Sequence, residues 1–143
     1  MGLITLGSLF DGISGFPLAG QRNGITAKWA SEIEPFPMKV STIRFPGMVQ
    51  HGDITRINGA EVEPVDIITG GSPCQDFSRI GEKLGGKKGS GTRSSLLFET
   101  IRIIEEKQDK PRWIIWENVK GVLDKKMRAS FFYYLEEMER LGY

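Results

Sequence analysis

Short apolar runs alternate along the chain with longer stretches in which apolar residues recur every three or four positions. The short runs end at glycine or at an acidic residue, which is typical of strands that stop at a loop. The longer stretches are bounded by proline and glycine, which is typical of helix ends. We expect strands at residues 3–10, 26–32, 48–54, 65–71 and 112–119, and helices within residues 16–24, 34–45, 94–108 and 127–142.

The last two helices have the clearest apolar faces. In the first, Leu97, Ile101 and Ile104 lie at helical spacing, and Pro111 follows its end. In the second, Gly142 is expected to cap the C-terminus. The residues expected to face inward there follow at steps of four and three: Met127, Phe131, Leu135, Met138 and Leu141.

Strands that alternate with helices predict an α/β fold, with a mostly parallel sheet covered by helices on both faces. Such sheets bind ligands at the carboxyl ends of their strands. Residues 1–143 are expected to form one domain or the N-terminal part of one, because no repeat, low-complexity run or linker divides them. The chain stops one residue after the expected helix cap, where the alternation would begin another strand. We therefore expect a sheet that is incomplete at the C-terminus.

The composition excludes several classes of protein. With 39% apolar residues among 143, the chain can form an ordinary core. Its single cysteine cannot form an internal disulfide, and no Cys/His pair has metal-ligand spacing, so we expect a reducing compartment and no metal. No apolar run reaches the ~18 residues of a membrane span. We expect a cytoplasmic or nuclear protein that is neither secreted nor bound to a membrane.

The turn after the first expected strand contains Gly12 and Gly15, which would let a cofactor approach the backbone and the helix N-terminus. A plain structural turn has the same glycines, so this signal is weak alone. Glu32 ends the second strand, where a carboxylate is suited to bind ribose hydroxyls. Asp53 ends the third strand and is suited to accept from an adenine amino group. Either acid alone would be a loop residue or a helix cap, but together they outline a nucleoside pocket.

Cys74 follows Pro73 in a loop after the fourth strand, although a lone cysteine is usually a small buried hydrophobe. Its polar neighbours and loop position favour a nucleophile instead. His51 is a weak candidate for its base, since a solvated loop histidine explains that residue equally well. Glu117 leaves the apolar run WIIW, so desolvation is expected to raise the pKa of its carboxyl group. That would suit an acid that donates a proton near neutrality, and an exposed strand-end carboxylate is the alternative.

Taken in chain order, these segments resemble the motifs of the C5-cytosine-specific DNA methyltransferases. The first three motifs are matched by SLFDGISG, ASEIE and GDIT. The later ones are matched by GSPCQDFS with its Pro-Cys pair, by GTRSSLLFE and by WENVKGV with its Glu-Asn-Val run. Six motifs in the right order span nearly the whole chain. The resemblance implies a Rossmann-like S-adenosylmethionine-dependent methyltransferase fold.

The resemblance implies a chemical role for each residue of the Pro-Cys and Glu-Asn-Val motifs. Cys74 would add to carbon 6 of cytosine, so that carbon 5 becomes nucleophilic enough to attack the methyl group of S-adenosylmethionine. Glu117 would hold the N3 and amino edge of the ring and supply the proton that favours addition. Pro73 would rigidify the nucleophile loop and Asn118 would tether it. The target lies inside duplex DNA, so the cytosine must be flipped out of the helix.

The resemblance also implies cofactor and DNA contacts. Phe10 would pack on the adenine, Glu32 would bind the ribose, Asp53 with Ile54 would meet the adenine edge, and Leu96 would line the methionine end. Ile33 stands where some members of the family carry tryptophan. Residues 79–93 hold five basic residues against one acid and resemble the loop that closes over DNA. The residues expected to contact DNA from this region are Ser78, Arg79, Lys83, Lys87, Lys88 and Arg93.

Other functions remain open at this point. The family's arginine-bearing motif, target-recognition region and final helix are not found in the sequence, so the chain alone is expected to be inactive and to need a complementary C-terminal chain. A tRNA cytosine-5 methyltransferase would share the chemistry. A nicotinamide-dependent oxidoreductase would share the glycine turn but leave the Pro-Cys and Glu-Asn-Val motifs unexplained. A non-catalytic protein that only binds the cofactor is the third alternative.

Overall fold

The computed structural model describes residues 2–72, 96–125 and 128–143. Within these residues the chain forms a five-stranded sheet in the order β3-β2-β1-β4-β5, and every neighbouring pair of strands is parallel. The strands are β1 (Thr5–Leu9), β2 (Thr26–Ser31), β3 (Val49–Gln50), β4 (Ile67–Gly70) and β5 (Trp113–Trp116). The predicted α/β fold with a parallel sheet is confirmed.

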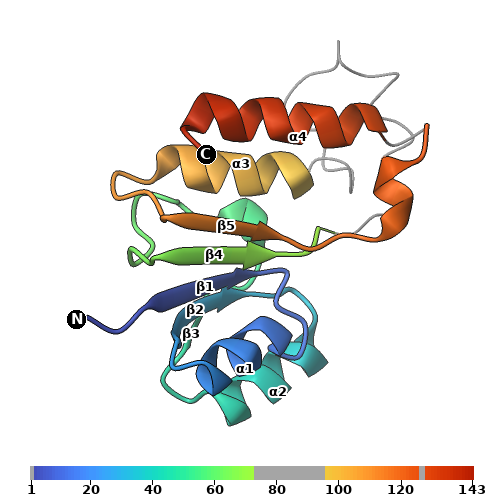
Figure 1. Ribbon diagram of the computed structural model, residues 1–143. Helices are drawn as coiled ribbons and strands as arrows, with labels where there is room; N and C mark the ends of the chain where they lie inside the picture. Colours follow the sequence, from blue (N-terminus) through green and yellow to red (C-terminus); the bar gives the residue numbers. More distant parts are fainter. Residues whose placement is uncertain (1, 73–95, 126–127) are drawn as a thin grey trace.

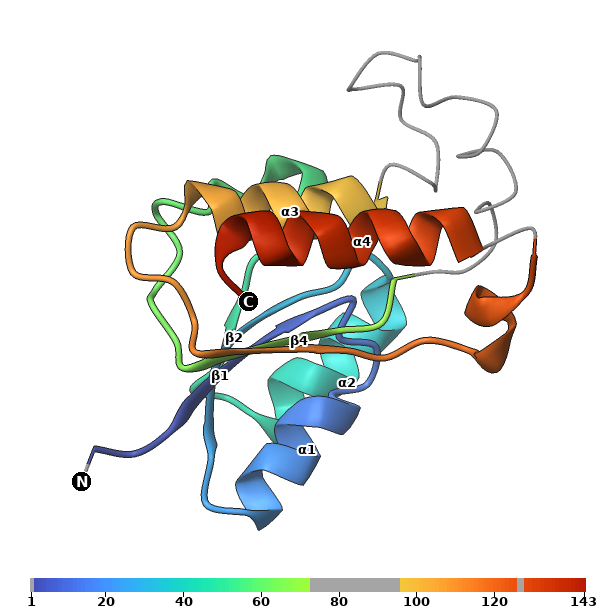
Figure 2. The same ribbon diagram turned by 45° about the horizontal axis from the view of Figure 1, so that its top comes forward.

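The helices cover the sheet on both faces. One face carries α1 (Gly15–Arg22) and α2 (Pro35–Arg44), and the other carries α3 (Leu96–Glu106) and α4 (Arg128–Leu141), which lie side by side (Figures 1 and 2). Two 3₁₀ turns, η1 (Ile54–Arg56) and η4 (Lys120–Leu123), were not predicted. Segments of three or four residues are too short to show a helical period.

The order of the strands places the ligand-binding end of the sheet. The chain builds β1, β2 and β3 outward in one direction and then returns to add β4 on the other side of β1. The order therefore reverses between β1 and β4, and the helices that follow these two strands, α1 and α3, lie on opposite faces of the sheet (Figure 1). Such a switch point opens a crevice at the carboxyl ends of the strands.

Trp29 is the largest fully buried side chain and fixes the packing of β1 against β2. Its indole lies where a side chain on Gly7 would have to be, since a Cβ built on Gly7 would meet the ring at 2.2 Å. The indole N–H donates to the Glu63 carbonyl at 2.9 Å. The close packing of Trp29 therefore requires glycine at position 7. This glycine lies in β1, which pairs with both β2 and β4.

The inward face of α4 differs from the predicted one by one position in its first half. The buried residues are Ser130, Tyr134, Met138 and Leu141, whereas Leu135 is 44% exposed. Tyr134 is turned inward because its ring packs on Trp116, with ring centroids 4.3 Å apart. Met127 lies outside the described residues. Gly142 adopts a left-handed φ of 98° and ends the helix as predicted.

The edge strand β5 is more exposed than its apolar sequence predicted. Its residues alternate between exposed and half-buried, and Trp113 and Ile115 are 63% and 46% exposed. α3 and α4 cover one face of this strand, while α1 and α2 lie under the other half of the sheet (Figure 1). No helix among the described residues is long and apolar enough to cross a membrane.

Candidate functional site

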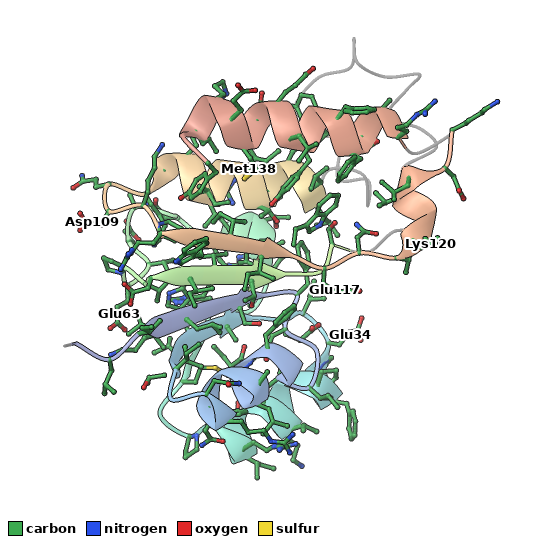
Figure 3. The ribbon with its side chains drawn as sticks, in the orientation of Figure 1. Glu34, Glu63, Asp109, Glu117, Lys120 and Met138 are labelled. Carbon is green, nitrogen blue, oxygen red and sulfur yellow. The ribbon has the colours of Figure 1, made fainter. Side chains whose placement is uncertain are left out.

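A cavity of about 530 Å³ opens at the carboxyl ends of the strands. It brings together six of the residues predicted to bind a cofactor: Phe10, Glu32, Ile33, Asp53, Ile54 and Leu96. The other lining residues were not predicted: Ser31, Glu34, Gly52 and Gly71. Three of the ten lining residues are acids and none is basic, so the described wall of the cavity carries negative charge. Figure 3 shows Glu34 at this end of the sheet, opposite Glu63 and Asp109.

The turn from β1 into α1 has an unusual backbone. Phe10, Gly12 and Ser14 all adopt positive φ, at 52°, 57° and 69°. This region is unfavourable for residues with a Cβ, and such strain is concentrated at functional sites. The turn holds Phe10 against the cavity. Gly15 begins α1, has open space around it and does not line the cavity, so its predicted cofactor contact stays a prediction.

The Glu32 carboxylate ties together the loops that follow β1 and β2. Its Oε2 accepts from the Gly12 N–H at 2.7 Å, and its Oε1 accepts from the N–H groups of Ile33 and Glu34 at 2.8 and 2.9 Å. A carboxylate has about four acceptor positions, so three are occupied by the protein. Glu32 can therefore take one ribose hydroxyl without giving up a backbone contact.

Asp53 begins the η1 turn. Its Oδ1 accepts from the N–H and the hydroxyl of Thr55, at 2.9 and 2.8 Å. No donor among the described residues reaches its Oδ2, which leaves an acceptor free beside the cavity. Ile54 follows it and is 5% exposed, so this pair offers one polar and one apolar contact.

Behind the cavity lies a buried polar cluster around Asp11, which the sequence analysis did not identify. Asp11 is 7% exposed, and its Oδ2 accepts from the hydroxyls of Ser14 at 2.6 Å and Ser41 at 3.1 Å. The Gln50 side-chain amide donates to Ser41 at 2.7 Å. Burial raises the pKa of Asp11, and the hydroxyl of Ser14 acts in the opposite direction. The cluster fixes α2 against the turn that carries Phe10 and Gly12.

Glu117 and Asn118 follow β5. The Glu117 N–H donates to the Gly70 carbonyl at 2.9 Å, and Asn118 Oδ1 accepts from the Val119 N–H at 2.8 Å. Glu117 is exposed, so the burial predicted from WIIW is not found among the described residues. The physical reason is that β5 is the edge of the described sheet and is itself only half covered.

Several predicted residues lie outside the described part of the chain: Pro73, Cys74, Ser78, Arg79, Lys83, Lys87, Lys88 and Arg93. The suggested pairing of His51 with Cys74 is therefore untested. The His51 ring instead meets Trp29 edge-on, with centroids 6.0 Å apart. Within residues 2–72, 96–125 and 128–143 there is no cluster of three or more His, Cys, Asp or Glu that could hold a metal ion.

Comparison with known proteins identifies the family. A family model described as C-5 cytosine-specific DNA methylase matches residues 4–143. The chain belongs to this family. The resemblance seen in its motifs is thus confirmed over nearly the whole sequence.

Two curated relatives that are named for different activities are similar to the chain. The type II methyltransferase M1.ScrFI of Lactococcus lactis subsp. cremoris is 39% identical over 136 residues, which is 94% of this chain and 33% of that protein. A DNA N-6-adenine-methyltransferase of Escherichia phage P1 is 35% identical over 128 residues, or 84% of this chain and 17% of that protein. The chain spans about a third of the length of relatives such as M1.ScrFI.

A solved structure supports the same assignment. A DNA modification methyltransferase encoded within an E. coli prophage superposes with a TM-score of 0.69 at 26% identity. The superposition covers 93% of this chain and 38% of that one. The fold seen here is therefore that of a DNA methyltransferase.

The residues missed by sequence reasoning differ in whether the sequence contained a signal that could have identified them. Glu34 and Gly52 lie next to predicted site residues, within ASEIE and GDIT, and carried a detectable signal. Asp11 was detectable as a charge between a buried strand and a helix. Ser41 carried none, because a serine within a helix contacts Asp11 only through the packing of α2.

Proposed function

We propose that this chain binds S-adenosylmethionine and takes part in methyl transfer to carbon 5 of cytosine in DNA. The observation that carries the cofactor assignment is the cavity, whose described lining has three carboxylates and no basic side chain. S-adenosylmethionine is positively charged at its sulfonium and ammonium groups, which carboxylates attract. A nicotinamide dinucleotide carries a negative pyrophosphate, for which the described lining offers no basic partner.

The residues of the cavity fit the shape and polarity of the cofactor. Phe10 offers a ring for the adenine, and Asp53 Oδ2 offers an acceptor for its amino group. Glu32 has one acceptor position left for a ribose hydroxyl. Leu96 gives the remaining wall an apolar contact. When bound, the cofactor would supply an electrophilic methyl group.

The chemical step is assigned from the family. We propose that the Cys74 thiolate adds to carbon 6 of the cytosine while Glu117 holds N3 and donates its proton there. Carbon 5 would then form its bond to the methyl group as the bond between that methyl group and sulfur breaks, which would release S-adenosylhomocysteine. Loss of the carbon-5 proton to water, departure of the thiolate from carbon 6 and return of the N3 proton to Glu117 would restore the aromatic ring. Pro73 and Asn118 are proposed to hold the loop that carries the thiol.

The substrate is proposed to be double-stranded DNA with the target cytosine flipped out of the stack. The basic residues between 78 and 93 would contact phosphates. Because the chain spans about a third of relatives such as M1.ScrFI, we propose that turnover requires a complementary C-terminal polypeptide. A cytoplasmic role in a restriction-modification system fits relatives that are type II methyltransferases.

Calorimetric titration with S-adenosylhomocysteine tests the cofactor assignment. We expect binding at one site, and we expect Glu32→Ala to weaken it by roughly 1 to 3 kcal/mol because a charged acceptor is lost. Glu63→Ala is the matched control, since Glu63 is an exposed acid at the other end of the sheet, paired with Lys28. Its affinity is expected to equal that of the wild type, and NADH is expected not to bind.

Two further results would separate the alternatives. Absence of binding by a folded chain would contradict the assignment unless the protein at its natural length binds. At that length, methylation of duplex DNA but not of tRNA would distinguish the proposed substrate from the tRNA alternative. Binding without transfer to either nucleic acid would favour a non-catalytic protein.

A further inference from the structure

Gly71 stands between the cavity and Glu117. It follows β4 directly, and its backbone lines the cavity. A Cβ built on Gly71 would lie 2.6 Å from Glu117 Oε2, 3.5 Å from the Glu117 carbonyl oxygen and 3.7 Å from Glu117 Cβ. These three atoms are the nearest ones to that point. The carboxylate of Glu117 thus occupies the space that any side chain at position 71 would need.

Other close glycines in this chain face obstacles that cannot move. A Cβ on Gly7 would meet the buried ring of Trp29 at 2.2 Å, and one on Gly59 would meet the Ile103 carbonyl oxygen at 2.4 Å. At Gly71 the obstacle is the end of a flexible, exposed side chain. The backbone of Gly71 is also outside the left-handed region. Folding therefore does not require glycine at position 71. The observed position of the Glu117 carboxylate does require it, because any side chain at position 71 would displace that carboxylate.

We propose that Gly71 is a positioning residue for Glu117. By lacking a side chain, it lets the Glu117 carboxylate lie beside the end of β4, next to the part of the cavity wall that Gly71 forms. The hydrogen bond from the Glu117 N–H to the Gly70 carbonyl at 2.9 Å fixes the backbone of Glu117 at the same place. The consequence for methyl transfer rests on the proposed function, in which Glu117 holds the cytosine.

The geometry is tested without any activity, by NMR on the chain itself. In the wild-type background, Glu117→Gln should shift the amide resonance of Gly71 at constant pH, because the carboxylate beside that backbone is replaced by an amide. In the Gly71→Ala background the same replacement should shift the amide resonance of residue 71 much less, because the methyl group has already displaced the side chain of residue 117. A Gly71 amide resonance that does not respond to Glu117→Gln in the wild-type background would overturn the proposal.

The functional consequence is measured on the chain together with the C-terminal polypeptide that turnover is proposed to require, whether this is a separate chain or part of the same one. Gly71→Ala should lower kcat for methyl transfer by roughly 10- to 100-fold, because a misplacement of about 1 Å can have that effect. The dissociation constant for S-adenosylhomocysteine should stay within about twofold, and the melting temperature should change by less than about 4 °C. Gly47→Ala is the matched control, since Gly47 also has an ordinary backbone but open space around it. It should leave kcat unchanged.

A double variant separates this inference from the proposed function. If Gly71 acts through Glu117, Gly71→Ala should lower kcat no further when Glu117 is already glutamine. An additional tenfold loss in that background would overturn the positioning role. If the single variant Glu117→Gln transfers methyl groups like the wild type, the proposed function of Glu117 fails. If Glu117→Gln is impaired but the single variant Gly71→Ala has a normal kcat, only the positioning role of Gly71 is overturned.

Discussion

The two ends of the sheet each hold a carboxylate beside β1, and the protein treats them in opposite ways. At the amino end, Asp66 Oδ2 accepts from the N–H and the hydroxyl of Thr5 at 2.8 and 2.9 Å, and these bonds lower the pKa of Asp66. At the carboxyl end, burial raises the pKa of Asp11 despite its serine partners. The surroundings of Asp66 favour its anionic form, whereas burial disfavours the anionic form of Asp11.

Other groups at the two ends differ in whether their polar atoms have hydrogen-bond partners, although burial disfavours the charged forms of both Lys107 at the amino end, whose pKa it lowers, and Asp11 at the carboxyl end. At the amino end, the buried Lys107 ammonium donates to the Val62 carbonyl at 2.9 Å, and the Trp29 indole donates to Glu63. The carboxyl end collects positive φ values at Phe10 and Ser14 and the free oxygen of Asp53. Polar groups that are satisfied hold the fold together, whereas strain and unused acceptors mark the end that is built to bind.

Trp29→Ala should produce the largest loss of stability, because the indole is 1% exposed and packs directly on Gly7. We expect the free energy of unfolding to fall by about 3–5 kcal/mol. Urea denaturation followed by circular dichroism measures it. Trp29→Phe keeps a ring but loses the hydrogen bond to Glu63, so it should cost less.

Gly7 provides a control for that interpretation. Gly7→Ala should destabilise the wild type, because the new methyl group meets the indole, and should be tolerated better when Trp29 is already alanine. Equal effects in both backgrounds would show that packing between these two residues does not set the stability of this region.

Sequence reasoning found the parts of the site that are local in the chain. Glu32 and Asp53 were identified because an acid at the end of a strand must lie at the ligand-binding edge of a parallel sheet. The contact of Gly71 with Glu117 could not be found that way, since it joins residues from two neighbouring strands at atomic distance. The same holds for the hydrogen bond from Ser41 to Asp11. It also holds for the packing of Tyr134 on Trp116, which explains why the buried face of α4 differs by one position from the predicted one.

Asp66→Asn should lower the free energy of unfolding by less than the substitution of Trp29 does, and only at pH values where the Asp66 carboxyl group is ionised. A carboxyl whose pKa is lowered in the folded state stabilises the protein above its unfolded pKa, and this contribution is lost as the pH falls through the folded value. The wild type should therefore be more stable than Asp66→Asn at pH 7, and the difference should shrink below the ordinary pKa near 3.8. Urea midpoints at pH 7 and pH 3 measure this, and a difference that is independent of pH would contradict it.

Asp11→Asn should have the smallest effect at neutral pH and the opposite dependence on pH. A carboxyl whose pKa is raised in the folded state contributes stability below its unfolded pKa, and that contribution is lost as the pH rises through the folded value. The asparagine oxygen can still accept from Ser14 and Ser41.

We therefore expect Asp11→Asn to match or exceed the wild-type stability at pH 7, within about 1 kcal/mol, and to lose any advantage near pH 3. The same urea midpoints test this. A loss of more than about 2 kcal/mol at pH 7 would mean that the anion itself stabilises the turn. If Asp11→Asn keeps its stability but binds S-adenosylhomocysteine more weakly, the Asp11 carboxylate contributes to cofactor binding and not to folding. The residue would then favour binding at the expense of stability.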